Sequence, residues 1–216
     1  MGADETLPCP LCGSATAGFW QEAQGRPYRR CGDCRLAFLD PGFLPSPEAE
    51  KAEYDLHEND PADPGYRRFL SRLVDRMLPL LPTGASGLDF GCGPGPAIAA
   101  MMCEHGLDVV NYDPLYAPAR ASLSRQYDFV TCTEVAEHFH RPARDFAILQ
   151  QVLKPGGILG LMTQPLTEDI DFPHWWYARE ISHVSFYAPA TMAWLAAHFG
   201  WQPLLADAAV WIFLKP

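Results

Sequence analysis

The 216-residue sequence has no apolar run near the roughly 18 residues that cross a bilayer, and its first residues lack the basic-then-apolar order of a signal peptide. Basic residues are also scarce, because 16 Lys and Arg stand against 26 Asp and Glu and give a net charge of −10. Such a surface repels polyanions as a whole. We therefore expect a cytoplasmic protein that contacts neither membranes nor nucleic acids.

Cysteine is concentrated near the N-terminus. Four of the seven cysteines form two C-x2-C pairs, Cys9 with Cys12 and Cys31 with Cys34, separated by 18 residues. This spacing lets four thiolates converge on a tetrahedral zinc ion and leaves no open position for catalysis. A segment this short needs such a metal to fold. Residues 1–40 are thus predicted to be a small zinc-ribbon-like module, with a strand pair between the cysteine pairs.

Residues 41–82 join this module to the rest of the chain. Two helices are predicted, at 47–56 and 66–81, and the second carries an apolar stripe at helical spacing that favours packing on a core. The link between them is polar, and its side chains are suited equally to a ligand contact or to a solvated loop. We interpret this region as a helical linker and lid over a cofactor site.

Residues 83–216 alternate between strand and helix patterns. Such alternation predicts an α/β domain with a doubly wound, Rossmann-like, mostly parallel sheet. The C-terminal segment is typical of an antiparallel hairpin. Strands are expected at 87–90, 108–114, 127–135 and 157–165, helices at 96–106, 142–154 and 189–200, and the hairpin at 201–216.

The turn "GLDFGCGPGP" follows the first of these strands and decides which ligand the sheet can hold. No lysine follows the glycines, which excludes the phosphate loop of nucleotide triphosphatases. A dinucleotide turn needs Gly or Ala where Pro96 stands, and proline offers no N–H to a pyrophosphate. Asp89 beside the turn would also repel phosphate.

S-adenosylmethionine fits these residues better, because it is cationic and carries no phosphate. Glycines at 91, 93 and 95 permit close backbone approach to its methionine and ribose portions. Asp113 ends the next strand, 22 residues after Gly91, and is placed for the ribose hydroxyls. An acid there also suits a nicotinamide cofactor, so the turn and the acid together favour S-adenosylmethionine.

The motifs "LDFGCGPG", "YDP", "FVTCTEVAEHF" and "LKPGGILGLMT" resemble those of class I S-adenosylmethionine-dependent methyltransferases, from about Tyr66 onward. The front of the chain is similar to the subgroup with an N-terminal four-cysteine module. The resemblance implies a set of residues around the cofactor: Asp89, Gly91, Cys92, Gly93, Gly95, Asp113, Pro114, Thr133 and Glu134.

One stretch departs from that family. Only 14 residues separate Asp113 from Asp128, and a crossover helix alone takes about 10–12. The third strand of the family therefore cannot fit in full, and its acidic adenine contact has no equivalent here. We expect a shortened connection and a sheet of six strands.

The stretch "EVAEHFH" is a candidate for acceptor chemistry. On a helical turn Glu134, Glu137 and His138 would share one face. Some methyltransferases bind a divalent metal, such as Mg²⁺, with a similar E-x-x-E-H cluster, and many others carry it without metal. Glu134 and His138 are therefore candidate catalytic residues, either as metal ligands or as the floor of the site.

The stretch "HWWYAREISHVSFY" lies where the family binds its acceptor. His183 is a candidate general base, or a further ligand beside His138. Trp175, Trp176 and Tyr177 are candidate walls of an apolar or planar acceptor pocket. Alternatively, the histidine is structural and the aromatic residues cap the core.

Three functions follow from these patterns. The first is a methyltransferase acting on oxygen or nitrogen of a small molecule. The second is an RNA or protein methyltransferase, favoured by the local basic cluster Arg26, Arg29, Arg30 and Arg35 and opposed by the net charge. The third is a non-catalytic binding module that kept the methyltransferase fold.

Overall fold

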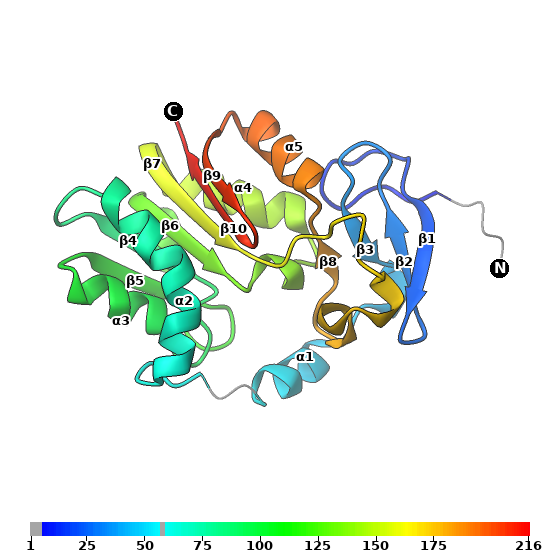
Figure 1. The fold of residues 1–216 in the computed structure, drawn as a ribbon, viewed down its shortest axis with the longest axis horizontal. Coiled ribbons are helices and arrows are strands. Elements are labelled where there is room, and N and C mark those ends of the chain that lie inside the picture. Colours follow the sequence, from blue (N-terminus) through cyan, green and yellow to red (C-terminus); the bar gives the residue numbers. More distant parts are fainter. Residues whose placement is uncertain (1–5, 57–58) are drawn as a thin grey trace.

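The main sheet of the protein is mostly parallel and has six strands in the order β5-β4-β6-β7-β10-β9. The structure is a computed structural model that describes residues 6–56 and 59–216. Strands β4 to β7 run parallel, and β10 pairs antiparallel with both β7 and β9 (Figure 1). The strands are β4 (Ser86–Phe90), β5 (Asp108–Tyr112), β6 (Tyr127–Thr133), β7 (Leu153–Met162), β9 (Gln202–Asp207) and β10 (Val210–Leu214).

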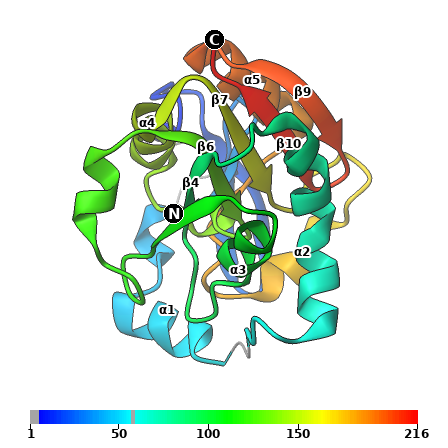
Figure 2. The ribbon, with the colours of Figure 1, turned by 90° about the vertical axis from the view of Figure 1, so that its left-hand side faces the viewer.

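Helices cover both faces of this sheet, as Figure 2 shows. One face packs against α2 (Pro64–Met77) and α3 (Ala97–Glu104), and the other against α4 (Pro142–Val152) and α5 (Pro189–Phe199). Successive side chains of a strand point to opposite faces, so Phe129 joins the first of these cores and Val130 the second. The predicted doubly wound α/β architecture is confirmed.

The helices before the sheet differ from prediction by a few residues. Helix α1 spans Pro47–Tyr54, whereas α2 starts two residues early because the Asp63 side chain accepts a hydrogen bond from Tyr66 N. Helix α2 ends at Met77 because Pro79 has no N–H, and the chain tightens into a 3-10 turn. Buried side chains of α2 pack on the sheet, which confirms the prediction of core packing.

Two connections near the site bear on the predictions. Between β5 and β6 the described chain forms an isolated bridge, Asp113 with Ala117, and a 3-10 turn, Arg120–Ser124, in agreement with the shortened connection and the six-stranded sheet. Helix α4 was predicted to continue to Lys154, but it ends at Val152. Leu153 already pairs with Tyr127 in the sheet, so "KPGG" belongs to β7 rather than to a separate turn.

The cysteine-rich segment forms a second, antiparallel sheet in the order β1-β2-β3-β8. Strands β1 (Gly18–Ala23) and β2 (Arg26–Arg30) form the predicted hairpin, and β3 (Ala37–Leu39) follows. The fourth strand, β8 (Ser185–Phe186), comes from the far end of the chain and pairs with β3 (Figure 1). The sheet of the N-terminal module is therefore completed by the segment that was predicted to bind the acceptor.

Among the described residues, no helix combines the length and the apolar character needed to cross a bilayer.

Candidate functional site

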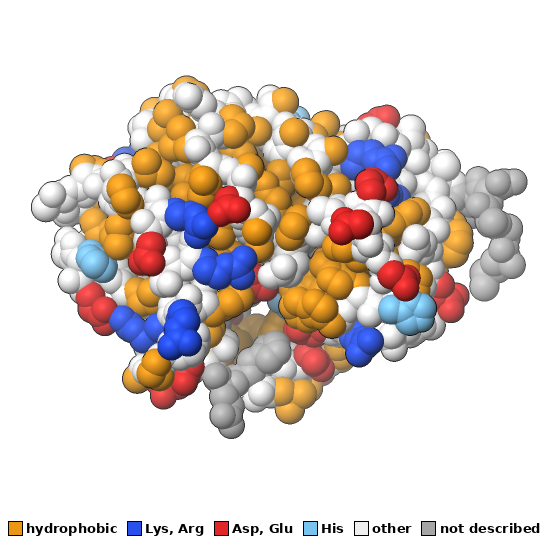
Figure 3. Space-filling model, viewed as in Figure 1, with side chains coloured by type: hydrophobic (Ala, Val, Ile, Leu, Met, Phe, Trp, Pro, Cys, Tyr) orange, Lys and Arg blue, Asp and Glu red, His pale blue; other side chains and the backbone are white. Residues whose placement is uncertain are grey.

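A cavity of about 880 Å³ lies at the carboxyl ends of β4, β5 and β6, where ligands bind in doubly wound sheets. Its lining joins the glycine turn and Asp113 at one end to His138, His183 and Trp176 at the other. Helix α1 and the start of α2 form one wall. Figure 3 shows the surface hollowed beside this wall. A single cavity thus contains residues of both the predicted cofactor site and the predicted acceptor site.

The first glycine of the turn is required by the backbone. Gly91 has φ of 80°, and its N–H donates to the carbonyl of Tyr112 at 2.7 Å. A Cβ at this position would overlap the side chain of Val135. Only glycine combines this left-handed conformation with such close packing between the turn and the loop after β6. Gly93, with φ of 61°, continues the turn and lines the cavity beside Cys92.

Gly95 is placed differently from the prediction. A Cβ on Gly95 would overlap the backbone carbonyl of Asn59, and Gly95 itself does not line the cavity. This glycine lets the link between α1 and α2 lie against the turn, so that Asn59 reaches the cavity. The polar link therefore contributes to the site, although His57 and Glu58 lie outside the described residues.

The two aspartates near the turn have different environments. Asp113 lines the cavity, and its carboxylate accepts hydrogen bonds from Gly93 N (3.2 Å), Leu115 N (2.8 Å) and Tyr116 N (3.0 Å). Asp89 is buried beneath the turn, outside the lining, and accepts a hydrogen bond from Thr131 Oγ1 at 2.7 Å. Burial, reinforced by the charge of Asp113, raises the pKa of Asp89 to about 6.

The other predicted cofactor residues lie along the same end of the cavity. Pro114 follows Asp113 in the lining, and Thr133 and Glu134 border it at the exit of β6. Beyond Asp113, where the family's third strand is missing, the lining continues with half-buried Leu123 and Ile148. The sequence pattern pointed to neither residue, because no motif marks them.

Two imidazoles lie close together at the acceptor end, with ring centroids 4.7 Å apart. Nδ1 of His138 lies 3.0 Å from the carbonyl oxygen of Ser182, and Nδ1 of His183 lies 2.7 Å from that of Tyr177. Because a carbonyl oxygen only accepts, both Nδ1 atoms must carry the hydrogen. Nε2 of His183 lies 3.2 Å from a carboxylate oxygen of Glu180.

The glutamates of "EVAEHF" do not share one helical face, and the geometry predicted for them is wrong. Glu134 has φ of 52° and precedes the short 3-10 turn Ala136–His138. Tyr177 donates its hydroxyl hydrogen to Glu134 at 3.3 Å. Glu137 is fully buried, and neither of its carboxylate oxygens has a hydrogen-bond partner among the described residues. Burial raises the pKa of both carboxyls, and repulsion adds to it, from Glu137 at Glu134 and from Glu180 at Glu137.

The three consecutive aromatic residues divide between cavity and core. Trp176 lines the cavity with 63% of its surface exposed, and buried Tyr177 lines it beside His183. Trp175 lies outside the lining and packs against Phe172 and Phe186. Trp176 and Tyr177 lie on a short 3-10 turn, and Trp175 lies between this turn and the preceding one, so neighbouring side chains point in different directions. The wall predicted at Trp175 is a core contact instead.

Several lining residues were missed by sequence reasoning. Tyr54 on α1 lies edge-on to His138, with centroids 5.1 Å apart, and Tyr66 and Phe69 at the start of α2 also line the cavity. Phe69 belonged to the stripe assigned to core packing. In the sequence these residues are visible only as aromatic residues near the start or end of a predicted helix. That position does not reveal whether their side chains face a cavity or the core.

The four N-terminal cysteines come together as predicted. Their four Sγ atoms all lie within 4.8 Å of one another. The Sγ atoms of Cys9 and Cys34 are 3.6 Å apart, and those of Cys12 and Cys31 are 3.5 Å apart. None of the seven cysteines, all within the described residues, forms a disulfide. Four thiols at these separations fit a closed tetrahedral metal site.

Two curated proteins are similar to this chain in sequence. In sequence, the chain is 31% identical to an Acinetobacter baylyi ubiquinone biosynthesis O-methyltransferase over 34% of this chain and 41% of that protein. A Saccharophagus degradans protein of the same description is 33% identical over 33% of this chain and 30% of its own length. The chain thus matches less than half the length of these curated relatives.

Two solved structures share the fold. The 1,6-didemethyltoxoflavin-N1-methyltransferase of Burkholderia thailandensis superposes with a TM-score of 0.53 at 16% identity, over 91% of this chain and 97% of that chain. CalO1, a methyltransferase of calicheamicin biosynthesis bound to S-adenosylhomocysteine, gives 0.50 at 15% identity, over 69% of this chain and 52% of its own.

The family assignment covers more of the chain than these relatives do. The family described as "Methyltransferase domain" matches residues 63–206, which run from the N-cap of α2 to the end of β9. This range contains the glycine turn, Asp113 and both imidazoles of the cavity. The resemblance to class I methyltransferases is therefore confirmed, and the chain belongs to the methyltransferase domain family.

Proposed function

We propose that the chain transfers a methyl group from S-adenosylmethionine to an oxygen or nitrogen atom of a small molecule. The observation that carries this proposal is the single cavity that joins the glycine turn to the two imidazoles. Its volume of about 880 Å³ lies within the range of sites that enclose small ligands. Family membership supports the cofactor, and the names of the relatives support a small acceptor.

The cofactor end would hold the methionine and ribose portions. The turn at Gly91 and Gly93 exposes backbone beside Cys92, and Asp113 offers the remaining lone pairs of its carboxylate to the ribose hydroxyls. Its three backbone hydrogen bonds keep this carboxylate in one orientation. Thr133 and Glu134 would lie under the sulfonium at the exit of β6.

The acceptor end would remove a proton as the methyl group is transferred in line from sulfur. Since Nδ1 of His183 donates to a carbonyl, the neutral ring has its lone pair on Nε2 and takes the acceptor's proton there. Glu180, 3.2 Å from that atom, would stabilise the imidazolium that forms. Trp176, Tyr54 and Phe69 provide walls suited to a planar acceptor.

The Arg cluster of the N-terminal module does not favour a macromolecular acceptor. Arg29 pairs with Asp40 at 2.7 Å, and Arg30 pairs with Glu168 at 2.7 Å. Arg35 approaches Glu168 at 3.6 Å, and Arg26 donates to backbone carbonyls. Each guanidinium is thus already engaged within the chain, and the macromolecular alternative loses its main support.

The N-terminal module would be held by a structural zinc ion bound to Cys9, Cys12, Cys31 and Cys34. Four sulfur donors suit zinc, and a closed tetrahedral shell supplies folding energy rather than catalysis.

A second metal would bind differently from the sequence prediction. Ligand atoms of Glu137, His138 and His183 lie within 4.8 Å of one another, whereas Glu134 is not part of this group. Two imidazoles with one carboxylate suit Zn²⁺ or Fe²⁺ better than Mg²⁺, which prefers oxygen ligands. This arrangement is the alternative to His183 as a base, and the number of metal ions bound per chain, two rather than one, would favour it.

Calorimetric titration with S-adenosylhomocysteine tests the proposed cofactor, with NADH as the control ligand. We expect one-to-one binding of S-adenosylhomocysteine alone. Asp113→Asn should weaken this binding about tenfold or more. The new side-chain NH2 group is a donor, so the backbone N–H of Gly93 either faces a second donor or loses its acceptor, and the turn is disturbed. Asp108→Asn, at the exposed start of β5, is the matched control and should bind like the wild type.

Acceptors are then screened with methyl-labelled S-adenosylmethionine, using small phenols and amines and, as the opposing arm, RNA. Transfer to a phenol or amine supports the proposal. Absence of S-adenosylhomocysteine binding, or transfer to RNA alone, would refute it.

A further inference from the structure

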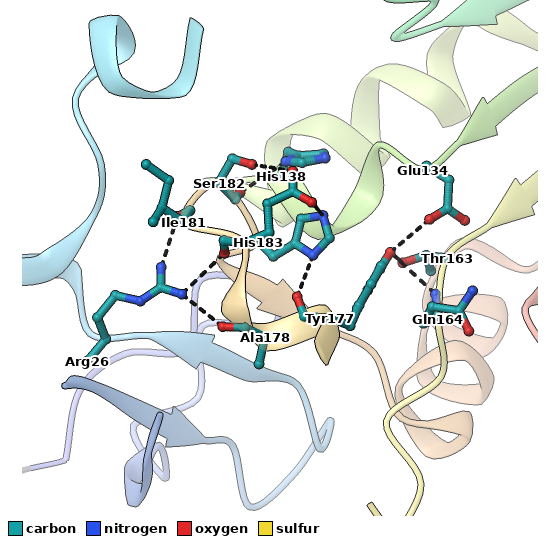
Figure 4. A network of polar contacts seen from close by, with 11 residues as sticks. Arg26, Glu134, His138, Thr163, Gln164, Tyr177, Ala178, Ile181, Ser182 and His183 are labelled. Carbon is teal, nitrogen blue, oxygen red and sulfur yellow. Dashed lines mark hydrogen bonds and ion pairs between the residues drawn. The ribbon is translucent and has the colours of Figure 1, made fainter. Parts of the chain in front are cut away.

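Arg26, the first residue of β2, reaches from the N-terminal module to the acceptor segment, residues 174–187 (Figure 4). Its guanidinium donates to the carbonyl oxygens of Ala178 (2.9 Å), Ile181 (2.9 Å) and Glu180 (3.2 Å). These partners lie more than 150 residues away along the chain. One side chain of the module thus satisfies three backbone acceptors of a single short segment.

The same segment orients both imidazoles of the cavity. The carbonyl of Tyr177 accepts from Nδ1 of His183, and the carbonyl of Ser182 accepts from Nδ1 of His138. In Figure 4 Arg26 lies on one side of residues 177–182 and the two imidazoles lie on the other. The carbonyls that bind the guanidinium therefore all lie between the two carbonyls, of Tyr177 and Ser182, that select the tautomer of each histidine.

We propose that Arg26 is a positioning residue for the acceptor site, which holds residues 177–182 so that both imidazoles keep their hydrogen on Nδ1. This inference rests on the proposed function, in which Nε2 of His183 takes the acceptor's proton. Arg26 acts from the far side of the segment and does not line the cavity.

The chemistry of this contact suits arginine. Residues 176–179 form only a 3-10 turn, so their carbonyls lack the regular hydrogen bonds of an α-helix. A guanidinium is always charged and presents its donors as a rigid planar fork, which can bind several carbonyls in one orientation. Hydrogen bonds from a charged donor are also stronger than those between neutral groups.

The rest of the module supports the position of Arg26. Tyr28, two residues along β2, lies under the guanidinium, with its ring centroid 5.7 Å from the central carbon. The Tyr28 ring also packs on Phe172, just before the acceptor segment, and on Phe186, within it. The module and the acceptor segment thus share one core, and Arg26 lies at its rim.

The test is ¹⁵N NMR of histidine-labelled protein, which distinguishes imidazole tautomers directly. Wild-type protein saturated with S-adenosylhomocysteine should show both His138 and His183 with hydrogen on Nδ1. In Arg26→Gln we expect both rings to shift toward a mixture of tautomers, while the Kd for S-adenosylhomocysteine stays within about twofold of the wild type.

Two further variants keep the test decisive. Arg35→Gln changes an exposed arginine of the same module and should leave both rings as in the wild type. Arg26→Lys keeps the charge and apolar stem, so it serves if Arg26→Gln does not fold. The lysine ammonium should hold residues 177–182 less well than the planar guanidinium does. The imidazole spectra of Arg26→Lys should therefore lie between those of the wild type and of Arg26→Gln.

Unchanged Nδ1–H signals for both rings in the Arg26 variants would overturn the proposal. A loss of S-adenosylhomocysteine affinity beyond about tenfold would also overturn it, because the effect would then not be local to the acceptor end. If the wild type fails to bind S-adenosylhomocysteine, the proposed function fails instead, and the unliganded spectra still report on Arg26.

Discussion

Asp89 shows how one buried carboxyl affects both the turn and the stability of the protein. It lies beneath the glycine turn and accepts a hydrogen bond from Thr131, and burial raises its pKa to about 6. At neutral pH the folded protein must therefore keep a charge away from water. The turn retains this charge close to the site, where it favours a cationic ligand.

A pH dependence of stability follows from Asp89. Because its folded pKa is raised from 3.8 to about 6, the group contributes stability below pH 4 that is lost as pH rises through 6. The loss is on the order of 3 kcal/mol. In denaturant unfolding, Asp89→Asn should therefore gain stability relative to the wild type between pH 4 and 7. A difference that stays constant across this range would contradict the assigned burial effect.

Gly91 is the residue on which the shape of the turn depends most. Gly91→Ala should lower the unfolding free energy by about 2–4 kcal/mol, from left-handed strain plus the overlap with Val135. Gly106→Ala is the matched control, because Gly106 has φ of 77° with open space around its Cβ position. Gly106→Ala should lower the unfolding free energy only by the left-handed backbone strain, about 1–2 kcal/mol. Equal losses in the two variants would argue against close packing at the turn.

At the scale of elements, the acceptor segment depends on strands that precede it by almost the whole chain. β8 pairs with β3, and buried side chains of β2 and β3 pack with Phe172 and Tyr177. The module therefore supports the acceptor end of the cavity rather than standing apart from it. Division of the chain at residues 40 and 82 remains a prediction.

Loss of a zinc ligand should consequently disturb both the module and the acceptor segment. Cys12→Ser is expected to abolish stoichiometric zinc, measured by mass spectrometry, at a cost on the order of 2 kcal/mol or more. In a chain of this size that lowers the Tm by about 4–8 °C. Cys103→Ser, on the exposed end of α3, should keep zinc and Tm. Retention of zinc in Cys12→Ser would refute the four-cysteine site.

At the scale of the molecule, charge separates the candidate acceptors. Figure 3 shows acidic and basic side chains interspersed on one face, without a field of one sign. The net charge is −10, and all four module arginines are engaged within the chain. Such a surface offers little to a polyanion.

A heparin column tests this directly. We expect the protein to pass through at about 50 mM salt, since few phosphates or sulfates can be neutralised. A matched anion-exchange column should retain it as the control. Retention on heparin that declines steeply with salt would favour the macromolecular acceptor instead.

The sequence by itself determined the alternating sheet and its glycine turn. These features follow from local signals: the periodicity of strands and helices, the absence of a lysine after the glycine turn, and Pro96. The short stretch between Asp113 and Asp128, which leaves no room for the third strand, is also a local signal. The four-cysteine spacing likewise predicted that the four thiols come together, because spacing alone restricts where thiols can converge.

The composition of the acceptor end was decided only by tertiary structure. The pairing of β3 with β8, the contact of Arg26 with residues 178–181 and the approach of Asn59 to Gly95 all join segments distant along the chain. No periodic pattern encodes such contacts, because they arise from backbone groups whose positions depend on the packed fold. The same reason explains why Glu134 left its expected helical face, and why Trp175 joined the core while Trp176 lines the cavity.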